Sequence, residues 1–378
     1  MSIEKEVLKN LEERIGKEYS IENFKSKSFF PLFKRITESF YNGTKSKIDM
    51  YSEFRLNFGY IDSMKINACA FHVDKVDFVM INMGCILYIF DYYHKLLGKP
   101  NMFTNIGTPN KEDFTITFPP SVDKNRIKFH NGAKDIDRRD YANFMGYISL
   151  KFLIYHELGH HYNGHMLYRN KLYKENNINQ IAMLQMANKA NDDVNPLEYQ
   201  AIEMDADAFA STQSIIDLID MYERKTCNVF APNIYKYIDN YEKLLNVWFY
   251  SIYSFFLLLE DEKIDIGNLC KYKYLPKTIR QIKNANILYK VLNYQYPNIL
   301  ANLGLDEAGI ENLFIDNAIK AETDFAKVKQ VKDRSDDVML LKDKRLQKHI
   351  EVVDDEWEIL RPKLERYSRG ILYTKNKK

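Results

Sequence analysis

The pentapeptide HELGH places His156 and His160 four residues apart. In an α-helix, residues with this spacing lie on one face with their Cβ atoms about 5–6 Å apart. Two imidazoles in that position can bind one metal ion at about 2.0–2.1 Å each. Glu157 lies about 100° further round the helix, where its carboxylate can reach a water molecule bound to the metal. The spacing therefore predicts a helix, with His156 and His160 as metal ligands and Glu157 as the general base.

A second, acidic segment supplies the predicted third ligand. A metal site that is open to substrate needs a third protein ligand, and residues 203–210 read EMDADAFA. Glu203 is the predicted ligand. Asp207 lies four residues later on the same helical face, where it can accept the other ring N–H of a metal-bound histidine and fix its tautomer. The alternative interpretation is an acidic helix face exposed to solvent.

Two more histidines follow the motif, but their spacing does not fit a third ligand. The long metal-binding pattern HExxHxxGxxH requires glycine at position 163 and histidine at position 166, where this chain has Asn163 and Met166. Gly164 and His165 are each displaced by one position, which is about 100° of helix. His161 and His165 are therefore predicted to be surface or supporting residues. A second metal site is the less favoured alternative.

Composition and net charge indicate which kinds of partner and which cellular location to expect. The chain has 378 residues, of which 46% are hydrophobic and 28% charged, as in globular proteins. Its net charge of +2 creates no overall field that would attract nucleic acid. The longest apolar run, 247–259, is too short to span a bilayer. The N-terminus shows no signal-peptide pattern, and the four cysteines form no CxxC pair. We therefore expect no nucleic-acid partner, no membrane span and a cytoplasmic location.

Hydrophobic periodicity predicts an α+β protein that is predominantly α-helical, with a small β-sheet packed beside the HExxH helix. Strands are expected at residues 65–73, 114–118 and 126–130. Helices are expected at residues 78–97, from 140 through 155 into the HExxH motif, at 181–187, 196–222 and 232–260, and in parts of the chain beyond residue 300.

The two predicted metal segments together resemble a known family. HExxH is followed by E-x-x-A-D-x-x-A, here Glu203, Ala206, Asp207 and Ala210. In this combination the chain resembles the gluzincin metallopeptidases, and within them the HtpX-like and CAAX prenyl protease branch. Asn-Ala at 67–68 and Pro-x-x-x-Arg at 276–280 are similar to that branch. A further similarity is to the soluble Lit-type phage-exclusion peptidases. The resemblance covers residues 65–285 and implies a zincin-like core with one Zn²⁺ per chain.

The chain departs from that branch in two ways. Membrane-embedded relatives have transmembrane helices, and none is expected here. Relatives often have a histidine beside the downstream proline, where this chain has Tyr274 and Leu275. Tyr274 and Arg280 are therefore the candidates for stabilising the transition state.

The resemblance also implies an activity and a domain organisation. The predicted activity is that of a zinc-dependent endopeptidase, which hydrolyses peptide bonds in a protein substrate through a metal-activated water. Three segments are expected: an N-terminal helical segment at 1–60, a zinc metallopeptidase domain at 61–300, and a charged helical region at 301–378. The sequence assigns no oligomeric state.

Substrate binding and alternative functions remain open on the sequence alone. An extended peptide could pair with the edge of a strand at 114–118 or 126–130, or both strands could be ordinary packed strands. One alternative function is a zinc hydrolase of a non-peptide amide, because the pocket selects the substrate of an activated water. Another is a non-catalytic protein-binding module, with residues 301–378 as its partner surface.

Overall fold

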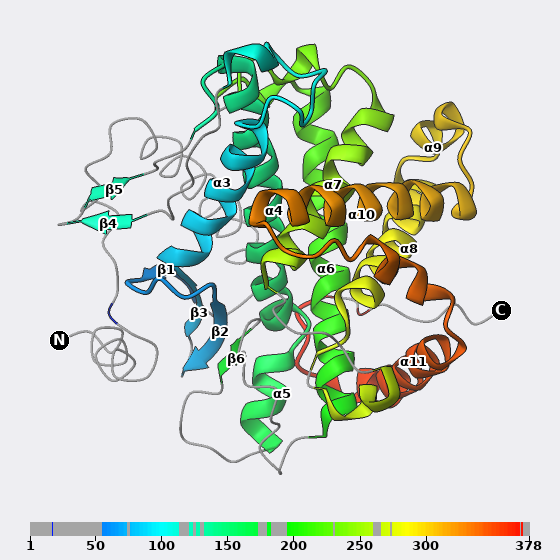
Figure 1. Ribbon diagram of the computed structural model, residues 1–378. Helices are drawn as coiled ribbons and strands as arrows, with labels where there is room; N and C mark the ends of the chain where they lie inside the picture. Colours follow the sequence, from blue (N-terminus) through cyan, green and yellow to red (C-terminus); the bar gives the residue numbers. More distant parts are fainter. Residues whose placement is uncertain are drawn as a thin grey trace.

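Helices form most of the structure. The computed structural model describes Lys17 and residues 55–73, 76–112, 121–123, 126–128, 132–172, 180–182, 195–229, 231–259, 266–272, 274–370 and 372. Four long helices lie side by side and a fifth crosses them (Figure 1): α3 (Met83–Leu97), α4 (Ile136–Tyr162), α6 (Pro196–Glu223) and α7 (Tyr241–Leu259), crossed by α10 (Glu307–Lys329). The other described α-helices are α5 (His165–Leu172), α8 (Lys277–Gln295), α9 (Pro297–Leu303) and α11 (Lys344–Leu364).

A small mixed sheet lies beside this framework. Its strands are β1 (Arg55–Ile61), β2 (Ala68–Val73), β3 (Val76–Asn82) and β6 (Gln180–Ala182), in the order β1-β3-β2-β6. β1 runs parallel to β3, whereas β2 is antiparallel to both β3 and β6. β4 (Ser121–Asp123) and β5 (Arg126–Lys128) form a separate antiparallel pair.

The predicted fold class is confirmed, since a predominantly helical α+β structure carries a small sheet next to the HExxH helix. The predicted helix at 78–97 is wrong at its start, because residues 78–82 belong to β3 and the helix begins at Met83. Residues 55–60 are also strand instead of helix, and β6 overlaps the start of the helix expected at 181–187. The expected strand at 114–118 lies outside the described residues, whereas β5 falls within the one expected at 126–130.

Buried polar groups fix where α4 begins. Asp135 caps the helix, because its carboxylate accepts hydrogen bonds from the backbone N–H groups of Asp137 and Arg138. The Arg138 side chain is fully buried. Its guanidinium donates to the carbonyl oxygens of Leu97, Lys99, Met102, Phe103 and Ile106. These bonds satisfy backbone acceptors at the end of α3 and in the following loop, and so fix α4 against α3.

Close packing of α4 on α6 depends on a glycine in the motif. A Cβ atom built on Gly159 would lie 3.2 Å from both the Cα and the carbonyl oxygen of Ala206 on α6. This separation is tighter than an ordinary van der Waals contact. The small residues at these two positions therefore let the helices approach, which brings the acidic segment of α6 next to the histidines of α4.

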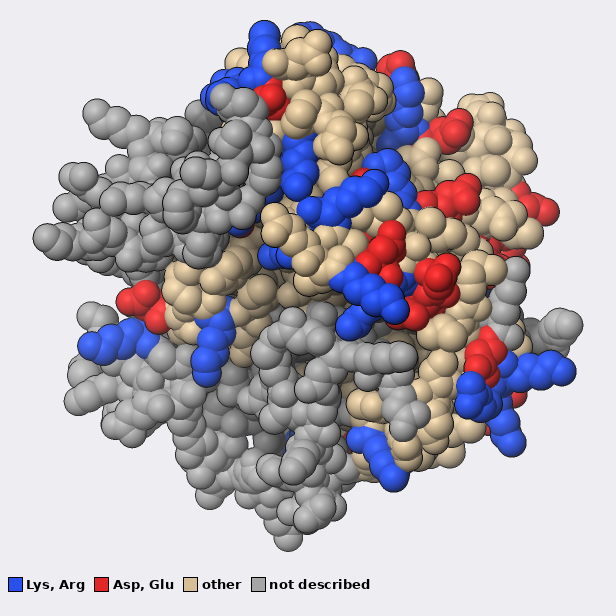
Figure 2. Space-filling view, in the orientation of Figure 1, with Lys and Arg blue, Asp and Glu red and all other residues tan. Residues whose placement is uncertain are grey.

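The C-terminal part of the chain packs on the same helices. α10 packs against α7 and α8, and α11 packs against α6. Beyond α11, Tyr367 and Ser368 cover Gly164, which has a φ of +81°, and the backbone N–H of Arg369 donates to the Tyr162 carbonyl. Acidic and basic side chains are mixed over the described part of the face in Figure 2. Within the described ranges, no helix is long and apolar enough to cross a membrane.

Candidate metal centre

Two imidazoles from α4 and one carboxylate from α6 converge at a buried point. His156 Nε2 lies 3.3 Å from Glu203 Oε2, and His160 Nε2 lies 3.6 Å from Glu203 Oε1. The two Nε2 atoms are 3.2 Å apart. All three side chains are at most 1% exposed, and one potential ligand atom from each lies within 4.8 Å of the others. This group could hold a metal ion.

The hydrogen-bond partner of His156 determines which of its ring nitrogens is available to bind a metal. Its Nδ1 lies 2.8 Å from Asp207 Oδ1, so Nδ1–H donates to that carboxylate and the Nε2 lone pair points toward Glu203. Arg280 holds Asp207 in turn, because its Nε and one terminal nitrogen donate to the two carboxylate oxygens at 2.6 and 2.8 Å. Burial acts to raise the pKa of Asp207, but the Arg280 charge and the His156 hydrogen bond lower it.

His160 is supported by a longer relay. Its Nδ1 lies 3.0 Å from His165 Nδ1, and His165 Nε2 lies 3.0 Å from Asp205 Oδ2. Asn163 donates to the same carboxylate oxygen. One Nδ1 atom of this pair donates to the other; with His160 as the donor, its Nε2 lone pair remains for a metal. Of the two predicted alternatives for His165, a surface or a supporting residue, the structure excludes the first, since His165 is fully buried and hydrogen-bonded to His160.

The donor set fits a cation on electrostatic grounds. The hydrogen bonds above leave two imidazole lone pairs facing each other beside Glu203, whose oxygens accept no hydrogen bond from any described residue. Buried acceptors without a donor are costly, and a divalent ion would bind all three. Burial lowers the pKa of His156, but the Asp207 hydrogen bond and the nearby charges of Asp207 and Glu203 outweigh this and raise it to about 9. Burial and the charges of neighbouring histidines hold the pKa of His160 well below its ordinary value.

His161 connects α4 to strand β3 of the sheet. Its Nε2 donates to the Phe78 carbonyl of β3 at 3.0 Å, and its Nδ1 lies 3.2 Å from Asp77 Oδ1. The side chain is 1% exposed, so the surface interpretation is wrong for His161 too. It contacts neither histidine of the metal group by a hydrogen bond in the described structure, and it therefore acts in packing α4 on β3.

Tyr274 and Arg280, the two residues predicted to stabilise the transition state, both lie near the metal group. Each already contacts another residue. Arg280 is 5% exposed and already paired with Asp207, and its guanidinium lies 3.9 Å from Glu203 Oε2. Tyr274 packs edge-to-face on Tyr199, with ring centroids 5.7 Å apart. Burial, the neighbouring Tyr199 and the Glu203 charge raise the pKa of Tyr274 well above its ordinary value.

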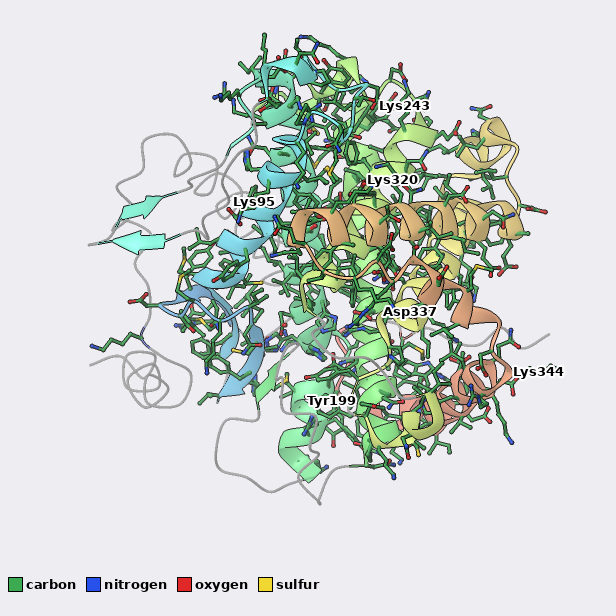
Figure 3. All side chains as sticks on the ribbon, viewed as in Figure 1. Lys95, Tyr199, Lys243, Lys320, Asp337 and Lys344 are labelled. Carbon is green, nitrogen blue, oxygen red and sulfur yellow. The ribbon has the colours of Figure 1, made fainter. Side chains whose placement is uncertain are left out.

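Tyr199 is a neighbour of the site that the sequence interpretation missed. It lies on α6 one turn before Glu203 (Figure 3) and is buried. Burial and then the Glu203 charge raise its pKa above the usual range. Glu157, the predicted base, is fully buried on α4, where its charge adds to burial in raising the pKa of the Cys85 thiol.

Fold and site together define an α+β protein with a buried two-histidine, one-carboxylate group that could hold a metal ion. Comparisons with protein-family models, with curated proteins and with solved structures found no match. The likeness to gluzincins therefore depends on the motif residues themselves.

Proposed function

We propose that this protein is a zinc-dependent endopeptidase. The observation that carries the proposal is the convergence of Glu203 on His156 and His160, with both histidines oriented by buried hydrogen-bond partners. Two histidines and one glutamate with an open fourth position are a common ligand set of catalytic zinc. Imidazole and carboxylate ligands suit Zn²⁺ better than Mg²⁺ or Ca²⁺, which prefer oxygen ligands alone.

The proposed chemistry divides between the ion and the chain. Bound zinc would lower the pKa of a water molecule and polarise the scissile carbonyl. Glu157 would take a proton from that water and pass it to the leaving amine. Asp207 and Arg280 would keep His156 in the tautomer that binds metal, and His165 would do the same for His160. We assign the transition-state role to Tyr274 in preference to Arg280, because Arg280 already forms two hydrogen bonds with Asp207.

We further propose that the substrate is a cytoplasmic protein bound in extended form. β5 is a candidate edge for such binding, since within the described chain it pairs with β4 alone. An added strand would supply backbone hydrogen bonds and present the scissile bond in a fixed direction.

The test compares wild-type protein with Glu157→Gln. Both should bind one zinc ion per chain by elemental analysis, whereas only the wild type should create new protein N-termini when expressed in cells. Glu311→Gln, at an exposed position on α10, is the matched control and should behave as wild type.

Each failure has a distinct meaning. Wild-type protein that binds no zinc would overturn the metal assignment. Zinc binding without new termini would favour a non-catalytic module or hydrolysis of a non-peptide amide. New termini made equally by Glu157→Gln would exclude Glu157 as the base.

A further inference from the structure

A cavity of about 180 Å³ lies between α6, α8 and α11, which pack against one another at the lower right of Figure 1. Met204 and Ala208 of α6, Ile287 of α8 and Trp357 of α11 form an apolar wall. Met204, Ala208 and Ile287 are each partly exposed, so the cavity opens to the surface. None of these residues belongs to the metal group.

One buried polar side chain faces this apolar cavity. Asn284 lines it from α8 and is 1% exposed. Neither its amide nitrogen nor its amide oxygen has a hydrogen-bond partner among the described residues. An amide buried without partners costs free energy, and such groups are found chiefly where a ligand supplies the missing bonds. Asn284 therefore offers both a donor and an acceptor to whatever occupies the cavity.

Charged side chains of both signs also line the cavity: Lys283, Lys290, Asp205, Asp354 and Glu358. The ammonium of Lys283 lies 2.7 and 2.6 Å from the two carboxylate oxygens of Asp354, and both side chains are partly exposed. Asp205, which also lines the cavity, is paired with His165 and Asn163. Because the lining carries charges of both signs, with Lys283 and Asp354 paired to each other, we take the occupant to be neutral, with an apolar body and one group that both donates and accepts.

We propose that this cavity binds one apolar residue of a polypeptide, with its side chain against Trp357 and Met204 and its own backbone N–H and C=O paired to the Asn284 amide. A residue in extended form presents its own N–H and C=O on one side of the chain, and these match the acceptor and the donor of Asn284. The volume is sufficient for a leucine-sized group, because a cavity of about 150 Å³ can bind benzene. The proposed binding needs no zinc, although Asp205 of the lining also lies 3.0 Å from His165 beside the metal group.

The binding test uses N-acetyl-leucine methylamide as the peptide probe and toluene as a probe without an amide. Both should bind the wild-type protein saturably, as followed by ligand-observed NMR. In Asn284→Leu the peptide probe should bind about tenfold more weakly, since both hydrogen bonds are lost, while toluene affinity should change less than about twofold. Ala208→Phe, which fills the cavity, should abolish binding of both probes.

Gln281→Leu is the matched control. Gln281 is also a fully buried amide on α8 whose side-chain atoms have no hydrogen-bond partner in the described chain, but it does not line the cavity. Its replacement should leave the affinity of the peptide probe unchanged. Equal losses in Gln281→Leu and Asn284→Leu, or no saturable binding of the peptide probe to wild type, would overturn the proposal.

A stability measurement separates a ligand-binding role of Asn284 from a structural one. Without any probe, Asn284→Leu should raise the midpoint of thermal unfolding, because it removes a buried amide that has no protein partner. The peptide probe should then raise the midpoint of the wild type but not that of the variant. A lower midpoint for unliganded Asn284→Leu would show that Asn284 stabilises the fold itself and would reject the ligand site.

Discussion

His165 reaches the candidate metal group only through His160, which makes its contribution separable from that of the ligands. Its Nδ1 shares a hydrogen bond with His160 Nδ1, and its Nε2 lies 3.0 Å from Asp205 Oδ2. Removing such an outer partner typically weakens metal affinity by about 10–100-fold. We therefore expect His165→Phe to bind zinc about 10–100-fold more weakly than the wild type does. Competition with a chelator of known affinity measures the difference.

His161→Phe is the control for that substitution. His161 is equally buried, at the end of α4, but contacts Phe78 and Asp77 on β3. Its loss should lower the free energy of unfolding while zinc affinity of the folded protein stays within about twofold of wild type. Similar losses of zinc affinity in both variants would mean that general loosening of α4, and not the His165 relay, explains the effect.

Protonation of His156 should compete with metal binding. Its pKa is raised from 6.5 to about 9, so the metal-free imidazole is protonated at pH 7 to 8. A metal must displace that proton, and its apparent affinity should therefore rise about tenfold between pH 7 and pH 8. A histidine of ordinary pKa would give little change over this interval. Chelator-buffered zinc titrations measure the slope, and a flat profile would contradict the raised pKa.

At the level of elements, the contact between α4 and α6 determines whether the ligands meet. Gly159→Ala adds a Cβ only 3.2 Å from backbone atoms of Ala206. Overpacking of this kind costs about 1–3 kcal/mol, which exceeds the roughly 1 kcal/mol that alanine gains over glycine inside a helix. Unfolding in denaturant should show a net loss of stability, and zinc affinity should fall because Glu203 is displaced.

Gly370→Ala provides the comparison, since a Cβ there meets nothing within 4 Å. That variant should match the wild type in both stability and zinc affinity. If Gly159→Ala is as stable as wild type and binds zinc equally well, the helix contact is more compliant than these distances indicate.

Sequence patterns predicted the long helices better than the strands. α6 was identifiable because Asn195 and Pro196 begin it with a cap and a proline in the first turn. β3 was not, because it lies between β1 and β2 in the sheet and is buried along nearly its whole length. Its continuous apolar run leads directly into the apolar α3, and periodicity cannot distinguish a buried strand from a buried helix there.

The same limit applies within the site. Helical spacing placed His156, His160, Glu203 and Asp207 correctly on their faces. It could not place His165, because α4 ends at Asn163, Gly164 takes a φ of +81°, and His165 begins a new helix, α5. His165 thereby returns toward His160 instead of continuing round the helix. The link to Asp205 also depends on how α6 crosses α4, which no local pattern encodes.

For the whole molecule, Asp77 joins parts that are distant in sequence. This carboxylate on β3 is fully buried and contacts His72 of β2 at 2.7 Å, His161 of α4, and the Arg369 guanidinium from the C-terminal segment. Burial acts to raise the pKa of Asp77, but His161, His72 and Arg369 hold it well below its ordinary value. The C-terminal segment therefore contacts the same buried carboxylate as α4 does, through Arg369 and His161 respectively. Residues 301–378 had been predicted as a separate region.

Arg369→Met tests this connection. Removing one partner of a buried ion pair leaves an uncompensated charge and costs about 3–5 kcal/mol. We expect the lower end of that range, because His72 and His161 still contact Asp77. The free energy of unfolding from a denaturant titration at neutral pH measures the loss. Arg366→Met, at an exposed position with its guanidinium 5.8 Å from the Tyr367 ring, should cost less than about 1 kcal/mol. Equal losses would show that Arg369 acts only as a surface charge and that the C-terminal segment does not hold α4 in place.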